Sequence, residues 1–249
     1  MIKKKASSAD DWVHKAFKKQ YLDIYSHRNN SEAERHCKSL VKLAQLDSHS
    51  LKILDCCCGA ARYSRILENQ GFNVIGMDLS YDLIKVAKQE EPNGNYCRGD
   101  IRALPFRNSF DRLLSLFTSF GYFEDDEENL RVLMEMHSSL KKGGLLYLDY
   151  LNPINVMASD WEEKSDKNGV IRSKKSINQK TQMVIKQVEW FSEDGNNSQY
   201  DERVKLYMSD WFIENGKKSG FECIGIYGDY SGGKLKKDSP RNVYLFEKI

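Results

Sequence analysis

The sequence has few prolines, no long apolar run and no excess of charge of one sign. Four prolines and 16 glycines among 249 residues exclude a fibrous or disordered composition. No window approaches the 18 uncharged apolar residues of a membrane-spanning helix, and no apolar stretch follows the first lysines as it would in a signal peptide. The 38 basic and 36 acidic residues lack the positive excess typical of nucleic-acid-binding proteins. We therefore expect a cytoplasmic protein without a membrane partner, and the charge disfavours nucleic acid.

The six cysteines also lack the spacing of a disulfide framework or of a paired C-x-x-C zinc site. Cys56, Cys57 and Cys58 are consecutive, and no histidine or second cysteine pair is spaced to complete a set of metal ligands. We expect reduced thiols that pack near a sheet as small side chains, and no metal.

The sequence does have an alternation of short apolar runs with amphipathic stretches, which is typical of βαβ units. With 40% hydrophobic and 30% charged residues, the chain can bury one full core. Ser31 and Glu34 form a capping box before a helical pattern that extends to Ala44. Further helices are predicted at 62–70, after Ser80, at 126–140 and after Ser209. The predicted fold is α/β, a mixed seven-stranded sheet with helices on both faces and with strands at 51–56, 73–78, 95–98, 111–117, 145–150, 222–227 and 242–247.

Alternating runs at 170–177, 181–191 and 199–207 interrupt this pattern and predict an inserted antiparallel β meander. We divide the single domain 1–249 into an N-terminal helical lid (1–48), a ligand-binding core (49–152), the β insertion (153–207) and the C-terminal part of the core (208–249). Val184, Val188 and Trp190 give the insertion an apolar face that must cover something: the ligand cleft, a second subunit or the sheet edge. Because the insertion leaves the carboxyl end of the fifth strand, we expect it to form part of an acceptor site.

Three acidic residues lie at the ends of three successive strands. Asp55 is in LDCCCGAAR, Asp78 in VIGMDLS and Asp100 in GDIRALPF. The carboxyl ends of parallel strands meet at the edge where open α/β sheets bind ligands, so these carboxylates should gather there. Asp78 can accept both hydroxyls of a ribose, and Asp100 can accept from an exocyclic amine while Ile101 covers a base. Each acid alone suits a helix cap equally well, but the three together favour a ligand site.

These segments, followed by FDRLLSLFTSFGYF and LKKGGLLYLDYLN, resemble the ordered motifs of class I (Rossmann-like) S-adenosylmethionine-dependent methyltransferases, in particular the bacterial small-molecule type. The resemblance covers nearly the whole chain. It implies S-adenosylmethionine as cofactor, S-adenosylhomocysteine as product, and no metal. The cofactor-binding residues that it implies are Tyr21, Asp55, Cys57, Gly59, Asp78, Leu79, Asp100, Ile101 and Phe117.

In the implied roles, Asp55 orders the loop and approaches the methionine ammonium, Asp78 holds the ribose, and Asp100 with Ile101 holds the adenine. Gly59 lets the cofactor lie against the backbone. Leu79 and Phe117 flank the cofactor.

The loop departs from the family pattern at two positions. Cys57 occupies the middle glycine position, and Ala61 replaces the last loop glycine. The methyl group of Ala61 restricts the backbone, which bears on cofactor affinity.

The acceptor side is less well defined. Trp12, Phe17, Tyr21 and Tyr25 share one helical face, a pattern that suits a core as well as a ligand contact. In the resembling family this segment folds over the cofactor as a lid. His14 is the one candidate general base. For substrate contacts we name Arg203, Tyr207 and Arg241, for which salt-bridge or packing roles are equally good.

The function predicted from these features is methyl transfer from S-adenosylmethionine to a nitrogen or oxygen of a small-molecule acceptor. The first alternative is a nucleic-acid methyltransferase, disfavoured by the charge balance and by FTSF where such enzymes carry an NPPY-like motif. The next is a nicotinamide-dependent oxidoreductase, disfavoured because the loop lacks G-x-G-x-x-G. A non-catalytic cofactor-binding protein stays open, as do the acceptor's identity and homodimer formation.

Overall fold

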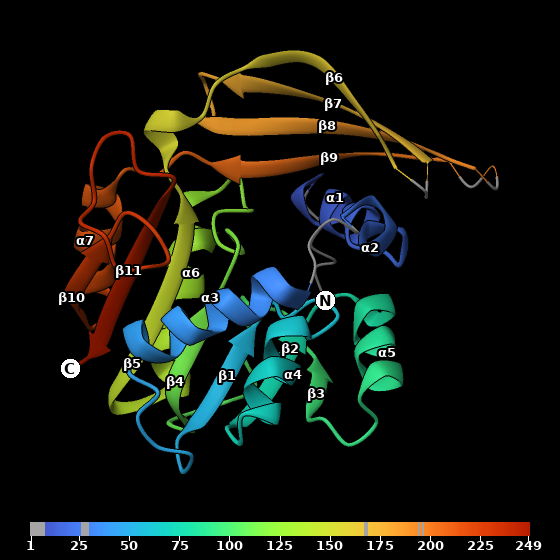
Figure 1. Cartoon of the computed structure of the whole chain (residues 1–249). Helices are drawn as coiled ribbons and strands as arrows, with labels where there is room; N and C mark the ends of the chain where they lie inside the picture. Colours follow the sequence, from blue (N-terminus) through green and yellow to red (C-terminus); the bar gives the residue numbers. More distant parts are fainter. Residues whose placement is uncertain (1–7, 26–29, 167–168, 194, 196) are drawn as a thin grey trace, which may run out of the picture.

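A computed structural model describes residues 8–25, 30–166, 169–193, 195 and 197–249. Within these residues the chain forms a large sheet flanked by helices and a smaller sheet that arches over one edge of it (Figure 1). The large sheet has seven strands in the order β10-β11-β5-β4-β1-β2-β3, and β11 is antiparallel to both neighbours. The predicted mixed seven-stranded sheet is therefore confirmed. Its strands are β1 Lys52–Cys56, β2 Asn73–Asp78, β3 Tyr96–Arg98, β4 Phe110–Ser115, β5 Leu140–Leu151, β10 Phe221–Tyr227 and β11 Arg241–Lys248.

Helices cover both faces because successive side chains of a strand point to opposite faces. On β1, Ile53 packs in a cluster with residues of α3 and α4, whereas Leu54 and Cys56 pack in a second cluster with residues of α6 and α7. Ser80 caps α5 as predicted, since its hydroxyl accepts the Leu83 N–H at 3.2 Å. The helices are α3 Asn30–Leu43, α4 Arg62–Asn69, α5 Tyr81–Glu90, α6 Asp126–Ser139 and α7 Ser209–Lys218.

The fourth strand ends two residues earlier than predicted. β4 ends at Ser115, because Phe117 and Thr118 have φ angles of 55° and 61°, in the left-handed region that a strand cannot contain. The apolar pattern of the sequence continues through Phe117 and carries no sign of this turn.

The smaller sheet is the predicted β insertion, with one additional strand. Its order is β6-β7-β8-β9. The first strand was missed because its sequence, SDWEEKSD, shows no alternation of apolar and polar residues, and residues 160–165 are all exposed at the sheet edge. Its strands are β6 Ser159–Asp166, β7 Gly169–Asn178, β8 Met183–Ser192 and β9 Ser198–Lys205, and a short 3-10 helix, η1 Pro153–Asn155, precedes them.

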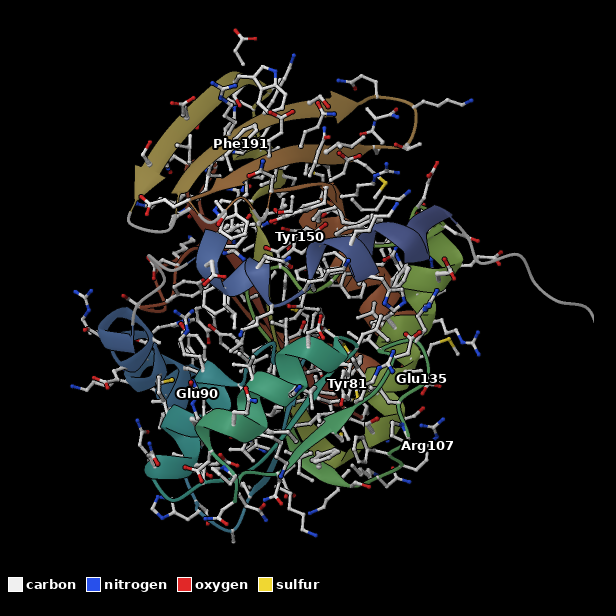
Figure 2. The ribbon with its side chains drawn as sticks, turned by 90° about the vertical axis from the view of Figure 1, so that its right-hand side faces the viewer. Tyr81, Glu90, Arg107, Glu135, Tyr150 and Phe191 are labelled. Carbon is white, nitrogen blue, oxygen red and sulfur yellow. The ribbon has the colours of Figure 1, made fainter. Side chains whose placement is uncertain are left out.

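The apolar face of this small sheet covers two N-terminal helices, α1 Ser8–Ala16 and α2 Gln20–Ile24, which we call the lid helices. Val188 and Trp190 are buried in one cluster with Trp12 and Ile24. Figure 2, in which Phe191 marks the small sheet and Tyr81 the start of α5, shows the lid helices lying between the two. Of the three options that the sequence left open for this face, none is the main contact, because the face packs on the lid helices.

No helix within the described ranges is long and apolar enough to cross a membrane. All six cysteines are free thiols.

Candidate cofactor site

A cavity of about 420 Å³ lies between the lid helices and the carboxyl ends of β1, β2, β3 and β4. This volume is in the range of small-molecule sites. The structure brings to its wall every residue that the sequence named for cofactor binding: Tyr21, Asp55, Cys57, Gly59, Asp78, Leu79, Asp100, Ile101 and Phe117.

Asp78 joins the loop after β1 to the start of α5. Its Oδ2 accepts the Gly59 N–H and its Oδ1 accepts the Ser80 N–H, both at 2.8 Å. Burial raises the pKa of Asp78 above its ordinary value, although these backbone donors act in the opposite direction. Each carboxylate oxygen keeps a further lone pair, so Asp78 can still accept two hydroxyl groups.

Asp55 has a different environment. It is 2% exposed, and its Oδ2 accepts a hydrogen bond from Ser64 Oγ on α4 at 2.6 Å. Burial raises the pKa of Asp55 to about 7, even though the Ser64 hydrogen bond lowers it. Asp55 thus ties β1 to α4 across the loop that joins them, and its role toward a bound cofactor stays a prediction.

The loop between β1 and α4 contains left-handed backbone at three positions. Cys57, Gly59 and Ala61 have φ angles of 61°, 59° and 59°. A residue with a side chain is strained in this region, at a cost of about 1–3 kcal/mol. The two departures from the family's glycine pattern, Cys57 and Ala61, therefore stand at positions whose conformation favours glycine. The loop holds its shape in spite of both.

The thiols in this loop are poor nucleophiles. The pKa of Cys57 is raised by a hydrogen bond with Cys56 and by burial, and that of Cys58 is raised mainly by burial. Both stay protonated near neutral pH, as packing residues would.

Asp100 is held at the cavity wall by Arg102. The Arg102 Nε lies 3.1 Å from Asp100 Oδ1, and its Nη2 lies 2.7 Å from Oδ2. Burial alone would raise the pKa of Asp100, but the hydrogen bonds and charge of Arg102 lower it overall. Arg102 also pairs with Glu128 at 3.1 Å and lies over the Phe123 ring. Asp100 is therefore a fixed, ionised acceptor beside Ile101.

Aromatic rings form the side of the cavity that faces the lid helices. Phe17, Tyr21 and Tyr25 come from residues 8–25, which contain the lid helices and which we call the lid segment. Tyr122 comes from the loop after β4. Phe17 stacks on Tyr122 at 5.9 Å between ring centroids, and Tyr21 lies 4.6 Å from Tyr25. The aromatic stripe predicted from the sequence therefore faces this cavity on one side and packs on the small sheet with Trp12 on the other.

Tyr25 connects the lid helices to the small sheet by polar contacts. Its hydroxyl donates to Glu202 Oε1 at 2.6 Å and accepts from Lys186 Nζ at 2.8 Å. Burial, followed by the Glu202 charge, raises the pKa of Tyr25 far above its ordinary value. This residue therefore stays protonated and structural.

Four residues named from the sequence do not line this cavity. His14 is exposed and lies at a smaller neighbouring hollow beside Ser80. Arg203 pairs with Asp201 at 3.0 Å.

Tyr207 is buried, donates to Asp126 at 2.6 Å and accepts from the Asn129 amide at 3.0 Å. Arg241 pairs with the buried Asp149 at 2.7 Å. The contacts of Arg203, Tyr207 and Arg241 are the salt-bridge and packing roles that we weighed equally for them.

The β insertion also lies outside the cavity wall: none of the described residues after Val132 lines it. The insertion therefore does not line this cavity, and its expected part in an acceptor site stays a prediction. Its apolar face is occupied by the lid helices, and it also contacts the loop after β4: Tyr122 packs against the same cluster, and the Lys205 N–H donates to the Gly121 backbone oxygen at 2.8 Å.

Sequence reasoning missed several wall residues. Arg62 lies over the rings of Tyr63 and Phe117, at 5.2 and 5.8 Å. Tyr122 is half-buried and packs against Trp12 and Phe17. The signals were present, since Arg62 directly follows the loop and Tyr122 belongs to the aromatic run FTSFGYF, but neither pattern says which side a ring or guanidinium faces.

Comparison with known proteins agrees with this geometry. Residues 53–144 match the family described as a methyltransferase domain. The chain is similar to demethylmenaquinone methyltransferase of Renibacterium salmoninarum, with 34% identity over 38% of this chain and 39% of that protein. It is also similar to dTDP-3-amino-3,4,6-trideoxy-alpha-D-glucopyranose N,N-dimethyltransferase of Streptomyces venezuelae, with 25% identity over 39% of this chain and 41% of that protein. These matches span about two fifths of either relative.

The likeness in fold is more extensive. The CcbJ methyltransferase of Streptomyces caelestis superimposes with a TM-score of 0.81 and 14% identity, over 95% of this chain and 99% of that chain. Residues 53–144 thus match a methyltransferase domain, and nearly the whole chain has the fold of a known methyltransferase.

Proposed function

We propose that the protein transfers a methyl group from S-adenosylmethionine to a nitrogen or oxygen atom of a small-molecule acceptor. The observation that carries the proposal is one cavity in which carboxylates from the ends of β1, β2 and β3 stand opposite the aromatic residues of the lid segment. The names of the relatives support a small-molecule acceptor, since one is a demethylmenaquinone methyltransferase and another an amino-sugar N,N-dimethyltransferase.

The residues present fit the cofactor. Asp78 has lone pairs for two ribose hydroxyls, and Asp100 with Ile101 offers an acceptor and an apolar surface for the adenine. Gly59 leaves room, because a Cβ at this position would meet a single side-chain carbon, Leu83 Cδ1, at 3.9 Å. When bound, the cofactor supplies a methyl group already activated on a sulfonium.

The task left to the protein is alignment and exclusion of water. The lid segment covers the cavity with Phe17, Tyr21 and Tyr25, and the small sheet holds the lid helices in place through Trp190 and the Tyr25 contacts. These side chains can therefore orient an acceptor against the cofactor and keep water out.

The wall offers few groups that could serve as a general base for a hydroxyl acceptor, and Asp55, with a pKa raised to about 7, is a group whose pKa suits that role. Within the described part of the cavity wall there is no histidine or lysine. The pKa values of Tyr25 and Tyr122 are far above neutral because both are buried, so neither can accept a proton as a general base. A neutral amine needs no such base to attack, whereas a hydroxyl does.

A thermal-shift comparison with S-adenosylhomocysteine, S-adenosylmethionine, NAD and NADP tests the proposal, because a ligand that binds only the folded state raises its stability. We expect both adenosyl ligands to raise the Tm and neither dinucleotide to do so. A larger shift with NAD than with S-adenosylhomocysteine contradicts the proposal.

A further inference from the structure

The loop after β4 supplies a continuous part of the cavity wall, which we call the wall segment (residues 116–123). Apart from Thr118, every residue in it lines the cavity: Leu116, Phe117, Ser119, Phe120, Gly121, Tyr122 and Phe123. The conformation at the start of this segment therefore sets where seven wall residues lie.

The backbone conformation at the start of the wall segment is unfavourable for the two residues that adopt it. Phe117 and Thr118 are consecutive, neither is glycine, and both are left-handed. A β-branched residue such as threonine is a strong outlier in this region. Such a conformation persists only where the surroundings determine it.

Asp149, a fully buried residue of β5, supplies those surroundings. Its Oδ2 accepts the Phe117 N–H at 2.7 Å, and its backbone oxygen accepts the Thr118 N–H at 3.1 Å. Its Oδ1 accepts from Arg241 Nε at 2.7 Å. Arg241 Nη2 in turn donates to Thr118 Oγ1 at 2.7 Å. The two charged residues thus hold the amides of both left-handed residues and the hydroxyl of Thr118.

A third residue completes this arrangement. The Tyr230 hydroxyl donates to Asp149 Oδ2 at 2.9 Å, and its ring stacks on His36 at 3.7 Å between centroids. Tyr230 lies in the connection between β10 and β11, and Arg241 begins β11. The C-terminal strands are therefore linked to the wall segment through the Asp149 carboxylate and through the direct contact of Arg241 with Thr118.

We propose that Asp149 and Arg241 are positioning residues, which hold the wall segment in the conformation that binds the cofactor although neither lines the cavity. Tyr230 supports them by orienting Asp149. The inference rests on the proposed function only for the identity of the ligand used to test it.

The test compares S-adenosylhomocysteine affinity and amide hydrogen exchange in four forms of the full chain: wild type, Asp149→Asn, Tyr230→Phe and Tyr147→Phe. Tyr147→Phe is the matched control, because Tyr147 is buried two residues before Asp149 and its hydroxyl has no hydrogen-bond partner within the described structure. We expect Asp149→Asn to weaken binding at least about tenfold, Tyr230→Phe a few-fold, and Tyr147→Phe less than about twofold. Exchange in Asp149→Asn should rise in residues 116–123 and stay unchanged at Leu113 and Leu114.

A glycine variant separates positioning from general stability. Glycine adopts positive φ without strain, so Thr118→Gly should recover part of the affinity lost in Asp149→Asn. A purely structural role predicts no recovery and a uniform rise in exchange along β4 and β5.

Several results would overturn the proposal: wild-type affinity and exchange in a folded Asp149→Asn protein, or no recovery by Thr118→Gly. If Asp149→Asn fails to fold, equal affinities of Tyr230→Phe and Tyr147→Phe overturn it. If the wild type binds no S-adenosylhomocysteine, the proposed function fails, and the exchange of residues 116–123 still decides whether Asp149 holds the wall segment.

Discussion

The two sides of the cavity are built in different ways. On the side that we propose binds the cofactor, here called the cofactor side, Asp55, Asp78 and Asp100 stand at the ends of neighbouring strands, and backbone N–H groups hold Asp78. On the lid side, the wall consists of rings from the lid segment and the wall segment, supported from behind by the small sheet (Figure 1).

The difference lies in the sequence distance over which each side is assembled. The cofactor side follows from the register of adjacent parallel strands, such as Asp55 opposite Gly76. The lid side depends on contacts between distant segments, such as Tyr25 with Glu202, which are 177 residues apart. We therefore expect mutations on the cofactor side to act on affinity and mutations behind the lid helices to act on stability.

The largest expected effect is on the lid side. Trp190 is 4% exposed in the cluster with Trp12, so Trp190→Ala should lower the free energy of unfolding of the lid helices and small sheet by about 3–5 kcal/mol. Hydrogen exchange of α1 and α2 measures the loss. The control is Trp161→Ala on β6, which is 47% exposed and should change stability by less than about 0.5 kcal/mol. Equal effects of the two variants would show that the small sheet does not support the lid helices.

On the cofactor side, Asp78→Ala should weaken S-adenosylhomocysteine binding by about 2–4 kcal/mol, because a charged acceptor for two hydroxyls is lost. Asp78→Asn should cost less. Calorimetry measures both. The matched control is Asp111→Ala, which removes a carboxylate near the start of β4, away from the cavity, where Asp111 pairs with Lys141 at 2.8 Å. This variant should leave the affinity unchanged. Wild-type affinity in Asp78→Ala would limit Asp78 to holding the Gly59 and Ser80 amides.

A pH-dependent effect of similar size should come from His36, which lies behind the cofactor side. It is 6% exposed, and burial, with the charges of Arg241 and Arg62, lowers its pKa to about 4. In the unfolded chain His36 takes up a proton near pH 6.5, whereas in the folded protein it stays neutral until the pH is near 4. The contribution of His36 to the free energy of unfolding is therefore at its maximum above pH 6.5. It is lost as the pH falls toward 4, a change of about 3 kcal/mol.

The pKa of Asp55 has the opposite effect, since burial raises it to about 7 and stability is therefore lost as the pH rises from about 4 to 7. The difference in the free energy of unfolding between wild type and His36→Gln isolates the contribution of His36. Denaturation at pH 4, 5, 6 and 8 should show that difference shrinking as the pH falls, and His49→Gln, on the exposed His49, is the control for loss of an imidazole at another position. A pH-independent difference would mean that His36 has the same pKa in the folded and in the unfolded protein.

The smallest expected effect tests the polar link on the lid side. Tyr25→Phe removes the hydroxyl that contacts Glu202 and Lys186 and should cost about 1 kcal/mol. Combined with Glu202→Gln, the two losses should be less than additive because the residues share one hydrogen bond. Tyr81→Phe, at a tyrosine that is 62% exposed, is the neutral control. Full additivity would show that the link contributes nothing.

The cofactor side was predictable from the sequence because its signals are local. Short apolar runs ending in Asp55 and Asp78 define buried strands and their carboxyl ends, and parallel pairing then places those ends together. Ser80 is likewise a local signal, because a helix cap depends on a few neighbouring residues.

The sequence by itself therefore determined the α/β fold, the order of the strand ends and the acids that stand there, since periodicity and capping are properties of short segments. Only the tertiary structure decided that the insertion covers the lid helices, that Arg241 pairs with Asp149 and that the chain turns left-handed at Phe117. Each of these depends on which distant residue supplies a partner for a buried charge, amide or ring. No local pattern records that choice, because it follows from burial in the complete fold.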